Sequence, residues 1–372
     1  MRSQGLVYVD TELTGGEVMS YWDESACYRL ELEQVLRLEA ATAELHRVCL
    51  AAAEHTVTTG RWRDFGIPVW AARAVAESFR RQPPSLYGRF DLCYDGVGEP
   101  KLLEYNADTP TGLVEAALVQ WYWLEETRPG ADQWNRLHEA LVERWGELTP
   151  ELAGPTVHFA WSADDTSGEE MMTVGYLAET AHQAGLNPVL VEMADLGYDG
   201  RRFVDLAGQP VSSCFKLYPW EWMLAEQFGP PALDPAAAVT WIEPAWKLLL
   251  SNKAVLAVAW ELFPDHPNLL PCYLDSPRGM SEYVAKPLLG REGASIRLHT
   301  RQGVQTTPGP YQSGSYCYQR FCPLPSFDSQ HVVLGSWVVG GQPAGAGLRE
   351  TRGLVTDNRA RFLPHYLETG AA

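Results

Sequence analysis

Polar and apolar residues alternate in two neighbouring segments, and the alternation predicts two β-strands. Polar side chains stand two residues apart on one face of residues 87–95 and of residues 101–108, and apolar side chains occupy the other face. Residues 96–100 between them contain two glycines and a proline, which is the composition of a turn. The pattern therefore predicts an antiparallel hairpin.

The hairpin is expected to gather polar side chains on one face. If Tyr94 faces Lys101, the antiparallel register gives two further pairs, Asp91 with Glu104 and Arg89 with Asn106. Carboxylates directly opposed across strands repel, so a hard divalent cation between them, such as Mg²⁺, accounts for the arrangement. An ordinary exposed hairpin whose polar face meets water is the alternative. Alternation alone does not decide between them.

Helical periodicity predicts the elements that flank the hairpin. Apolar residues recur at threes, fours and sevens over residues 28–55, which predicts a packing helix. Two further helices are predicted over residues 113–126 and 132–147.

A second region begins near Pro155 and has the pattern of a small α/β lobe. A strand over 156–161, a helix over 171–184 and a strand over 187–193 predict a parallel βαβ unit. Residues 203–205 and 214–218 are candidates for extending the same sheet. Neither a dinucleotide fingerprint nor a phosphate-binding P-loop motif occurs in this region.

The last third of the chain combines a lysine with a glycine-containing loop. After an apolar helix over 254–262, a strand over 282–287 carries Lys286, and Gly290 and Gly293 follow. Glycines at this spacing suit a loop whose backbone N–H groups close over phosphates, and a lysine can meet a phosphate as a point charge. A simple surface turn is the alternative. The phosphate-binding reading is favoured by the combination with the hairpin and with a second lysine, Lys253.

Further strands are predicted over residues 316–321, 332–339 and 345–350, with a turn at 340–343. Gln319 in the first of these strands is placed to hydrogen-bond an adenine edge. A solvated polar face is an equally good reading of that position.

Composition narrows the class of protein. A chain of 372 residues exceeds the size of most single cores, so two or three lobes are expected. No apolar run reaches the roughly 20 residues that span a bilayer, and the first residues lack the apolar core of a signal peptide. Seven scattered cysteines, without C-x-x-C or H-x-x-x-H spacing, predict a reduced cytoplasmic protein without a zinc site. The net charge of −18 disfavours nucleic acid as a partner; it suits a cationic substrate or simply keeps the protein soluble.

Five motifs resemble those of the glutathionylspermidine synthase family, and more narrowly its short bacterial members that consist of the synthetase domain alone. The motifs are RFD at 89–91, EYNAD at 104–108, YPWEW at 218–222, KLLLSNK at 247–253 and YVAKP at 283–287. The resemblance runs from about Tyr21 to Leu354. It implies an ATP-grasp fold with a permuted topology, in which the metal-binding strands come early, and a reaction that joins a carboxylate to an amine at the expense of ATP through an acyl phosphate.

The resemblance also implies roles for individual residues. Asp91, Glu104 and Asn106 match the family's Mg²⁺ ligands, and Arg89 matches its catalytic arginine. The residues that match its ATP-binding positions are Lys253, Lys286, the phosphate-covering loop with Gly290, Gly293 and Ala294, and the adenine-side glutamine Gln319. Arg349 resembles a late arginine near the active site, although the surrounding spacing differs. The upstream amidase domain of some members has no counterpart here, so bond formation rather than hydrolysis is implied.

Together these observations predict a mixed fold, an α+β ATP-grasp unit with a small α/β pre-ATP-grasp lobe. Residues 1–150 are expected to hold the hairpin and packing helices, residues 151–240 the small lobe, and residues 241–372 the ATP-binding part that completes the unit. The predicted function is an ATP-dependent carboxylate–amine ligase with ATP and Mg²⁺ as cofactors and a small-molecule acid and amine as partners. A nucleotide-binding protein without turnover and a metal-dependent transferase are the alternatives.

Overall fold

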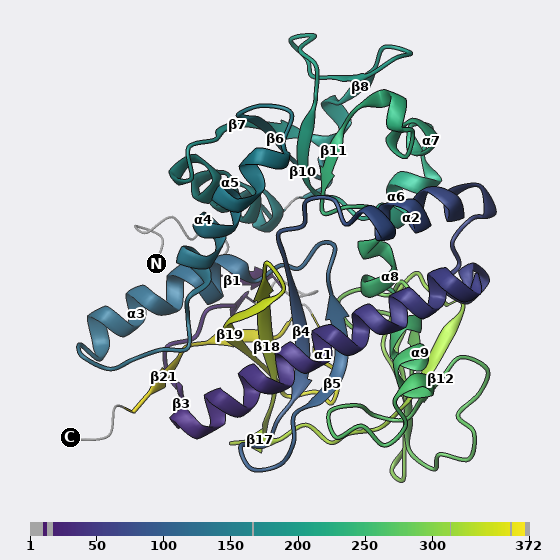
Figure 1. The fold of residues 1–372 in the computed structure, drawn as a ribbon. Coiled ribbons are helices and arrows are strands. Elements are labelled where there is room, and N and C mark those ends of the chain that lie inside the picture. Colours follow the sequence, from purple (N-terminus) through teal and green to yellow (C-terminus); the bar gives the residue numbers. More distant parts are fainter. Residues whose placement is uncertain (1–9, 13–17, 166, 313, 358, 369–372) are drawn as a thin grey trace.

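Two antiparallel sheets and one parallel sheet form the layers of this mixed α/β protein (Figure 1). The computed structural model describes residues 10–12, 18–165, 167–312, 314–357 and 359–368. Within these ranges the three sheets have six, five and four strands. In Figure 1 the four-stranded sheet lies at the top, the six-stranded sheet in the centre and the five-stranded sheet at the lower right.

The six-stranded central sheet is antiparallel and contains the predicted hairpin. Its strand order is β20-β19-β18-β4-β5, and β17 pairs with β18. The strands are β4 (Tyr87–Cys93), β5 (Lys101–Asn106), β17 (Ser326–Phe327), β18 (Gln330–Val339), β19 (Gln342–Thr351) and β20 (Arg361–Leu363). Because β18 covers the outer edge of β4, every residue of β4 is buried. The hairpin is therefore built into the core by strands from the end of the chain.

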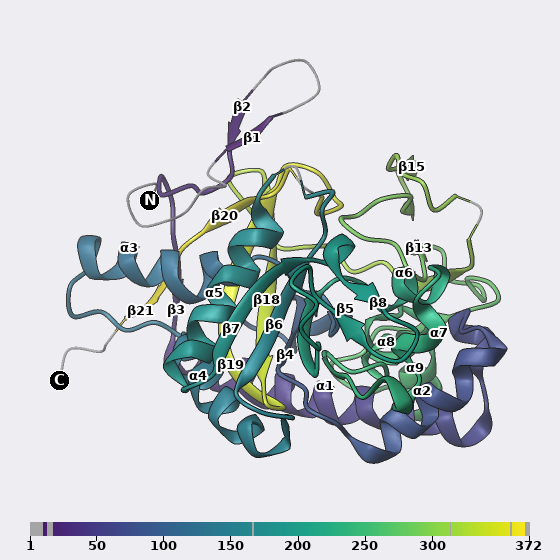
Figure 2. The same ribbon diagram turned by 90° about the horizontal axis from the view of Figure 1, so that it is seen from above.

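A long helix, α1 (Leu32–Thr59), covers one side of the central sheet, as Figures 1 and 2 both show. Its buried stripe includes Leu38, Leu45 and Val48. The predicted range 28–55 is wrong at both ends. The helix begins after a capping box in which the Gln34 side chain accepts the Glu31 N–H at 2.9 Å. It ends at Gly60, whose φ of 71° stops helical propagation.

The four-stranded sheet is parallel, as predicted for a βαβ unit. Its order is β11-β10-β6-β7, and its strands are β6 (Thr156–Trp161), β7 (Asn187–Glu192), β10 (Ser213–Leu217) and β11 (Thr240–Ile242). Helix α5 (Glu169–Gln183) connects β6 to β7. Residues 203–205 do not extend this sheet. They form β9 (Phe203–Val204), which pairs with β8 (Gly197–Tyr198), and the Asp205 carboxylate accepts two backbone N–H groups that turn the chain away.

The five-stranded sheet is antiparallel and carries Lys286 and Gln319. Its order is β12-β16-β13-β14-β15. The strands are β12 (Cys272–Tyr273), β13 (Tyr283–Pro287), β14 (Arg297–Thr300), β15 (Gly303–Thr306) and β16 (Tyr316–Arg320). The predicted strands at 282–287 and 316–321 are confirmed, and they pair with each other.

The remaining elements connect and cover the sheets. Two-stranded pairs are β1 (Asp10–Glu12) with β2 (Val18–Ser20) and β3 (Tyr28–Leu30) with β21 (His365–Leu367). The other α-helices are α2 (Val69–Arg81), α3 (Gln120–Thr127), α4 (Leu137–Leu148), α6 (Trp220–Ala225), α7 (Gly229–Ala232), α8 (Lys247–Ser251) and α9 (Ala254–Leu262). Short 3₁₀ segments are Trp62–Phe65, Thr149–Glu151, Met193–Asp195 and Pro235–Ala237, and Glu115–Val119 is a π-helical segment.

Of two further predicted helices, one is confirmed and the other begins later than expected. The helix expected over 113–126 begins at Leu113, passes through the π-helical segment Glu115–Val119 and ends with α3 at Thr127. The helix expected from Asp132 starts only at Leu137, because the preceding backbone is used elsewhere: Trp134 O accepts the Ala346 N–H at 3.1 Å. The residue limits of the three predicted segments of the chain stay a prediction.

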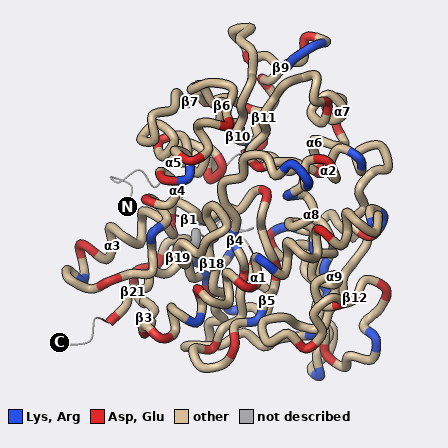
Figure 3. The backbone as a smooth tube through the Cα atoms, in the orientation of Figure 1, with Lys and Arg blue, Asp and Glu red and all other residues tan. Residues whose placement is uncertain are grey.

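Charged residues are spread over all layers in the part of the chain that the structure describes. Lysines and arginines lie among aspartates and glutamates on each sheet and its helices (Figure 3). None of the helices described is long and apolar enough to cross a membrane.

A buried ion pair joins the end of the hairpin to the parallel sheet. Lys216 Nζ on β10 lies 2.6 Å from Asp108 Oδ1, and both side chains are fully buried. The second carboxylate oxygen of Asp108 accepts the Trp220 N–H at 2.9 Å. The small lobe is therefore attached to the central sheet by charge as well as by packing.

We predict that Lys216→Met lowers the free energy of unfolding by about 3–5 kcal/mol, because it leaves the Asp108 carboxylate buried without its cation. Urea unfolding of the two proteins measures the difference. Arg136→Met serves as the control, since the Arg136–Glu143 pair is exposed and is expected to contribute less than about 1 kcal/mol. Equal losses in the two variants would contradict this account of the lobe attachment.

Candidate active site

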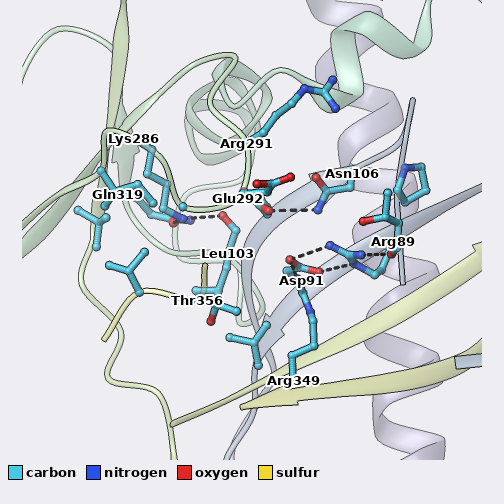
Figure 4. Close-up of a pocket in the computed structure, with 18 of the residues that line it drawn as sticks. Arg89, Asp91, Leu103, Asn106, Lys286, Arg291, Glu292, Gln319, Arg349 and Thr356 are labelled. Carbon is cyan, nitrogen blue, oxygen red and sulfur yellow. Dashed lines mark hydrogen bonds and ion pairs between the residues drawn. The ribbon is translucent and has the colours of Figure 1, made fainter. Parts of the chain in front are cut away.

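A cavity of about 260 Å³ lies between the central sheet and the five-stranded sheet (Figure 4). Residues of the small lobe, such as Leu217 and Trp222, complete its lining. Most side chains predicted for the site lie in its wall, namely Arg89, Asp91, Glu104, Asn106, Lys286, Gly293, Gln319 and Arg349. The structure thus brings together residues from the early hairpin and from three later segments of the chain.

The register of the hairpin confirms the predicted pairs Asp91–Glu104 and Arg89–Asn106. The predicted pair Tyr94–Lys101 is wrong. A β-bulge shifts the register by one residue just beyond Asp91, so that Lys101 pairs with Cys93 instead.

The bulge provides an attachment point for the five-stranded sheet. Leu103, the extra residue on β5, has no ladder partner on β4, and its carbonyl oxygen accepts a hydrogen bond from Lys286 Nζ at 2.9 Å. Lys286 Nζ also donates to Gln319 Oε1 at 2.7 Å, and Gln319 Nε2 donates to the Leu102 carbonyl at 2.9 Å. In this structure the Gln319 amide oxygen positions Lys286. The predicted role of Gln319 at an adenine edge stays a prediction.

Asp91 lies between two guanidinium groups. Arg89 Nε is 2.7 Å from one of its carboxylate oxygens, and Arg349 Nη2 is 2.6 Å from the other. Gly335 on β18 makes room for this arrangement, since a Cβ there would come within 2.9 Å of Arg89 Cδ. Arg349 therefore belongs to the site geometrically. Figure 4 shows both arginines converging on Asp91 from different strands.

Glu104 is held in its ionised form by lysines. Lys253 Nζ lies 3.0 Å from its carboxylate, and Asn106 Nδ2 donates to it at 3.1 Å. Burial opposes ionisation of Glu104, but the ammonium groups of Lys253 and Lys286 hold its pKa well below the usual range. Burial lowers the pKa of Lys286, against the attraction of Glu104. The cavity wall therefore alternates carboxylates with cations.

The predicted phosphate-covering loop lines the same cavity as the hairpin, through Arg291, Glu292 and Gly293. Gly293 has a φ of +67°, and a Cβ there would meet the Thr356 carbonyl oxygen at 2.7 Å, so glycine is required. Lys253 Nζ donates to the Gly290 carbonyl at 2.7 Å. Arg291 donates to Thr109 Oγ1 at 2.8 Å and lies 2.9 Å from Glu221, which ties the loop to the small lobe.

Not every predicted residue lines the main cavity. Lys253 and Gly290 line a smaller neighbouring cavity, which shares Asn106, Thr109 and Arg291 with the first. Ala294 lines neither of these two cavities.

Sequence reasoning gave no role to several residues that line the main cavity, among them Glu170, Arg291, Glu292 and Thr356. Arg291 and Glu292 stand between the two glycines of the loop. Their charge, next to the predicted phosphate-covering glycines, is the sequence feature that could have indicated a place in the cavity wall. Glu170 and Thr356 come from segments without a motif and are brought to the cavity by the fold alone.

The donor set of the hairpin suits a hard cation. Two carboxylates and an amide supply oxygen atoms, the ligands that Mg²⁺ prefers, while substrate phosphates and water complete its shell. Across the residues described, no group of three or more His, Cys, Asp or Glu side chains is arranged to hold a metal ion. The fit therefore depends on Asn106 as well as on Asp91 and Glu104, which all line one cavity.

Two further glutamates near the cavity have raised pKa values. Burial raises the pKa of Glu115 to about 7, and the nearby charge of Glu169 acts in the same direction. Burial also raises the pKa of Glu170 to about 7. These carboxyl groups change their charge near neutral pH, in contrast to Glu104.

Fold and site together are those of a mixed α/β protein with a pocket lined by paired carboxylates, lysines and arginines. The chain belongs to the glutathionylspermidine synthase family, because the family model described as "Glutathionylspermidine synthase preATP-grasp" matches residues 1–368. This confirms the resemblance found in the sequence.

Individual relatives agree with this assignment. The chain is 41% identical over 360 residues to a "Putative acid–amine ligase" of Haemophilus influenzae, covering 93% of this chain and 91% of that protein. It is 28% identical to the trypanothione synthetase of Crithidia fasciculata and to the bifunctional glutathionylspermidine synthetase/amidase of Escherichia coli, covering 54% and 56% of their lengths. The chain thus spans about half of these two longer relatives. The predicted enzyme class, an ATP-dependent carbon–nitrogen ligase, is confirmed by these relatives.

A solved structure shares the fold. The glutathione synthetase-like effector GSS30 of Globodera pallida superposes with a TM-score of 0.59, covering 99% of this chain and 94% of that chain, at 10% sequence identity. At this identity the likeness shows the fold alone.

We predict that Glu115→Gln raises the free energy of unfolding above that of the parent protein by more at pH 8 than at pH 5.5. The folded state binds the Glu115 proton more tightly than the unfolded state, so the free energy of unfolding of the parent protein falls as pH rises from about 4.5 to about 7. The variant lacks this proton and gains about 2 kcal/mol over the parent between the two pH values, because about 1.5 pH units lie between pH 5.5 and a pKa of about 7.

Urea unfolding at both pH values tests this expectation. Glu54→Gln, at an exposed position of α1, is the control and is expected to follow the parent protein. A Glu115→Gln variant whose stability relative to the parent is the same at both pH values would contradict the raised pKa.

Proposed function

We propose that this chain is an ATP-dependent carboxylate–amine ligase built on a permuted ATP-grasp fold, in which residues 1–150 and 241–372 form the ATP-grasp unit and residues 151–240 the pre-ATP-grasp lobe. The observation that carries the proposal is the meeting of two sets of side chains in one cavity. The oxygen donors of the hairpin line this cavity together with Lys286 and residues of the glycine loop. We also propose that the protein is cytoplasmic, with its cysteines reduced.

The lysines and the loop are proposed to bind the phosphates of ATP. Lys253 and Lys286 are buried cations whose partners in this structure are Glu104, the Gln319 amide oxygen and backbone carbonyls. Phosphate oxygens are stronger acceptors than carbonyls for an ammonium group. Gly293 keeps the loop backbone close to the cavity, which allows N–H groups of the loop to contact a phosphate.

Asp91, Glu104 and Asn106 are proposed to hold Mg²⁺. Their oxygens lie on one face of the hairpin, and the lowered pKa of Glu104 keeps its carboxylate available as a ligand. Bound there, Mg²⁺ would neutralise negative charge on the ATP phosphates.

The arginines are proposed to stabilise charge at the reacting carboxylate. The substrate carboxylate attacks the γ-phosphoryl group of ATP, ADP leaves, and the acyl phosphate reacts with a neutral amine to give an amide and inorganic phosphate. Arg89 and Arg349 converge on Asp91 at the cavity wall, where guanidinium groups can offset charge on the phosphoryl and tetrahedral oxygens. The contact of Arg291 with Glu221 would hold the loop closed and keep water from the acyl phosphate.

The proposed substrates are a small-molecule acid and a small-molecule amine. The names of two relatives mention trypanothione and glutathionylspermidine, but this chain is not assigned to either product. Glu170 and Glu292 in the cavity wall would favour a positively charged substrate. An ADP-release screen across pools of amino acids, short peptides and amines would identify the pair.

We predict that Asp91→Ala or Glu104→Ala lowers ADP release at least a hundredfold with the acid and amine that the screen identifies, because either change removes a proposed Mg²⁺ ligand. Circular dichroism checks that the fold is kept. Asp275→Ala, at an exposed ion pair remote from the cavity, is the control and is expected to keep full activity. Unchanged turnover in either hairpin variant would rule out the metal assignment.

Arg89→Ala is expected to separate chemistry from binding. Loss of the guanidinium should lower kcat by about a hundredfold or more, while the KM for ATP changes by less than about threefold, since the lysines and the loop are proposed to bind the nucleotide. Steady-state kinetics measure both constants, with exposed Arg278→Ala as the control. A variant that changes only KM would exclude the proposed role of Arg89.

A further inference from the structure

Two cysteines meet at the boundary between the central sheet and the five-stranded sheet. Cys93 is the last residue of β4, two positions after Asp91, and Cys322 follows β16, three positions after Gln319. Their sulfur atoms lie 3.3 Å apart. Cys322 lines the cavity, whereas Cys93 is buried behind it.

We propose that Cys93 and Cys322 form a reversible thiol–disulfide site that responds to low-molecular-weight disulfides and weakens nucleotide binding when oxidised. The first half of this proposal concerns the protein alone. The second half rests on the proposed ATP-binding function.

The exchange needs one oxidant, a small disulfide RSSR. The Cys322 thiolate attacks one sulfur of RSSR, forms a mixed disulfide and releases RS⁻. The thiolate of Cys93 then attacks the Cys322 sulfur and displaces the second RS⁻. The two protons of the protein thiols leave with the two RS⁻ groups as RSH, so the protein loses two electrons and RSSR gains them.

Position and environment make Cys322 the attacking group. It is half-buried and reachable through the cavity. The hydrogen bond between the two sulfurs lowers the pKa of Cys322, and the charge of Lys101 acts in the same direction although burial opposes it.

The bond would join two sheets that are linked near the cavity by weaker contacts. These contacts include the hydrogen bonds from Lys286 to the Leu103 carbonyl and from Gln319 to the Leu102 carbonyl. A disulfide has a sulfur–sulfur distance of about 2.0 Å, so its formation draws the wall at Cys322 toward β4. This displacement is expected to narrow the cavity between Asp91 and Lys286, both of which line it.

Oxidation with glutathione disulfide tests the proposal. After treatment of the full chain, peptide mass spectrometry is expected to show a Cys93–Cys322 cross-link that dithiothreitol reverses. Cys93→Ser and Cys322→Ser are expected to lose the cross-link, whereas Cys27→Ser, at a half-buried cysteine elsewhere, keeps it. Oxidation at other cysteines, or a mixed disulfide on Cys322 that does not resolve, would overturn the site.

Nucleotide binding is measured separately, with Mg²⁺·ATP and reduced protein first. If the reduced protein binds ATP, the oxidised protein is expected to bind it at least fivefold more weakly, and Cys322→Ser, which lacks the attacking thiol, is expected to show no change after treatment. An oxidised protein with unaltered affinity would overturn the regulatory half. Failure of the reduced protein to bind ATP would count against the proposed function instead, and the cross-link would still be judged by mass spectrometry alone.

Discussion

The mutual repulsion of two carboxylates across strands β4 and β5 is the constraint on which the site depends. Asp91 and Glu104 stand opposite each other on one face of the hairpin, a pairing that is unfavourable without counter-charges. Arg89 and Arg349 neutralise the first carboxylate, and Lys253 neutralises the second. Two of these cations, Arg349 and Lys253, come from distant segments. The charge balance of the early hairpin therefore depends on the correct folding of the later chain.

The same contacts position the rest of the cavity. The bulge in the hairpin frees the Leu103 carbonyl for Lys286, which anchors the five-stranded sheet. The Asp108–Lys216 pair anchors the small lobe, and the Arg291–Glu221 pair joins that lobe to the glycine loop. In the proposed function, a bound metal and the phosphates of ATP would exchange partners with these groups, the metal taking the carboxylates and the phosphates taking the lysines. The apo pairing would then hold each side chain near its working position.

Sequence patterns predicted what depends on local period and missed what depends on distant contacts. Two-residue alternation was enough to place Asp91 and Glu104 on one face of the hairpin, because the face of a strand follows directly from that period. Their pairing came from an assumed register anchored on Tyr94–Lys101; the structure confirms the first pair, and the bulge removes the second. The alternation did not predict the bulge. Its extra residue, Leu103, accepts a hydrogen bond from Lys286 of the five-stranded sheet. The central helix was recognised but its start at Leu32 was not, since the cap formed by Gln34 gives no apolar signal. The lysine and glycine pattern, supported by the motif resemblance, predicted Lys253 and Lys286, whereas Thr356 and Glu170 reach the cavity only through the fold.

The most direct test of the central claim is a crystal structure of the reduced protein with Mn²⁺ and a non-hydrolysable ATP analogue, with the metal located by its anomalous signal. The account predicts a Mn²⁺ peak bound by oxygens of Asp91, Glu104 and Asn106, with the phosphates in contact with Lys253 and Lys286 beneath the glycine loop. A nucleotide bound outside this cavity, or a metal without contact to the hairpin carboxylates, would contradict it.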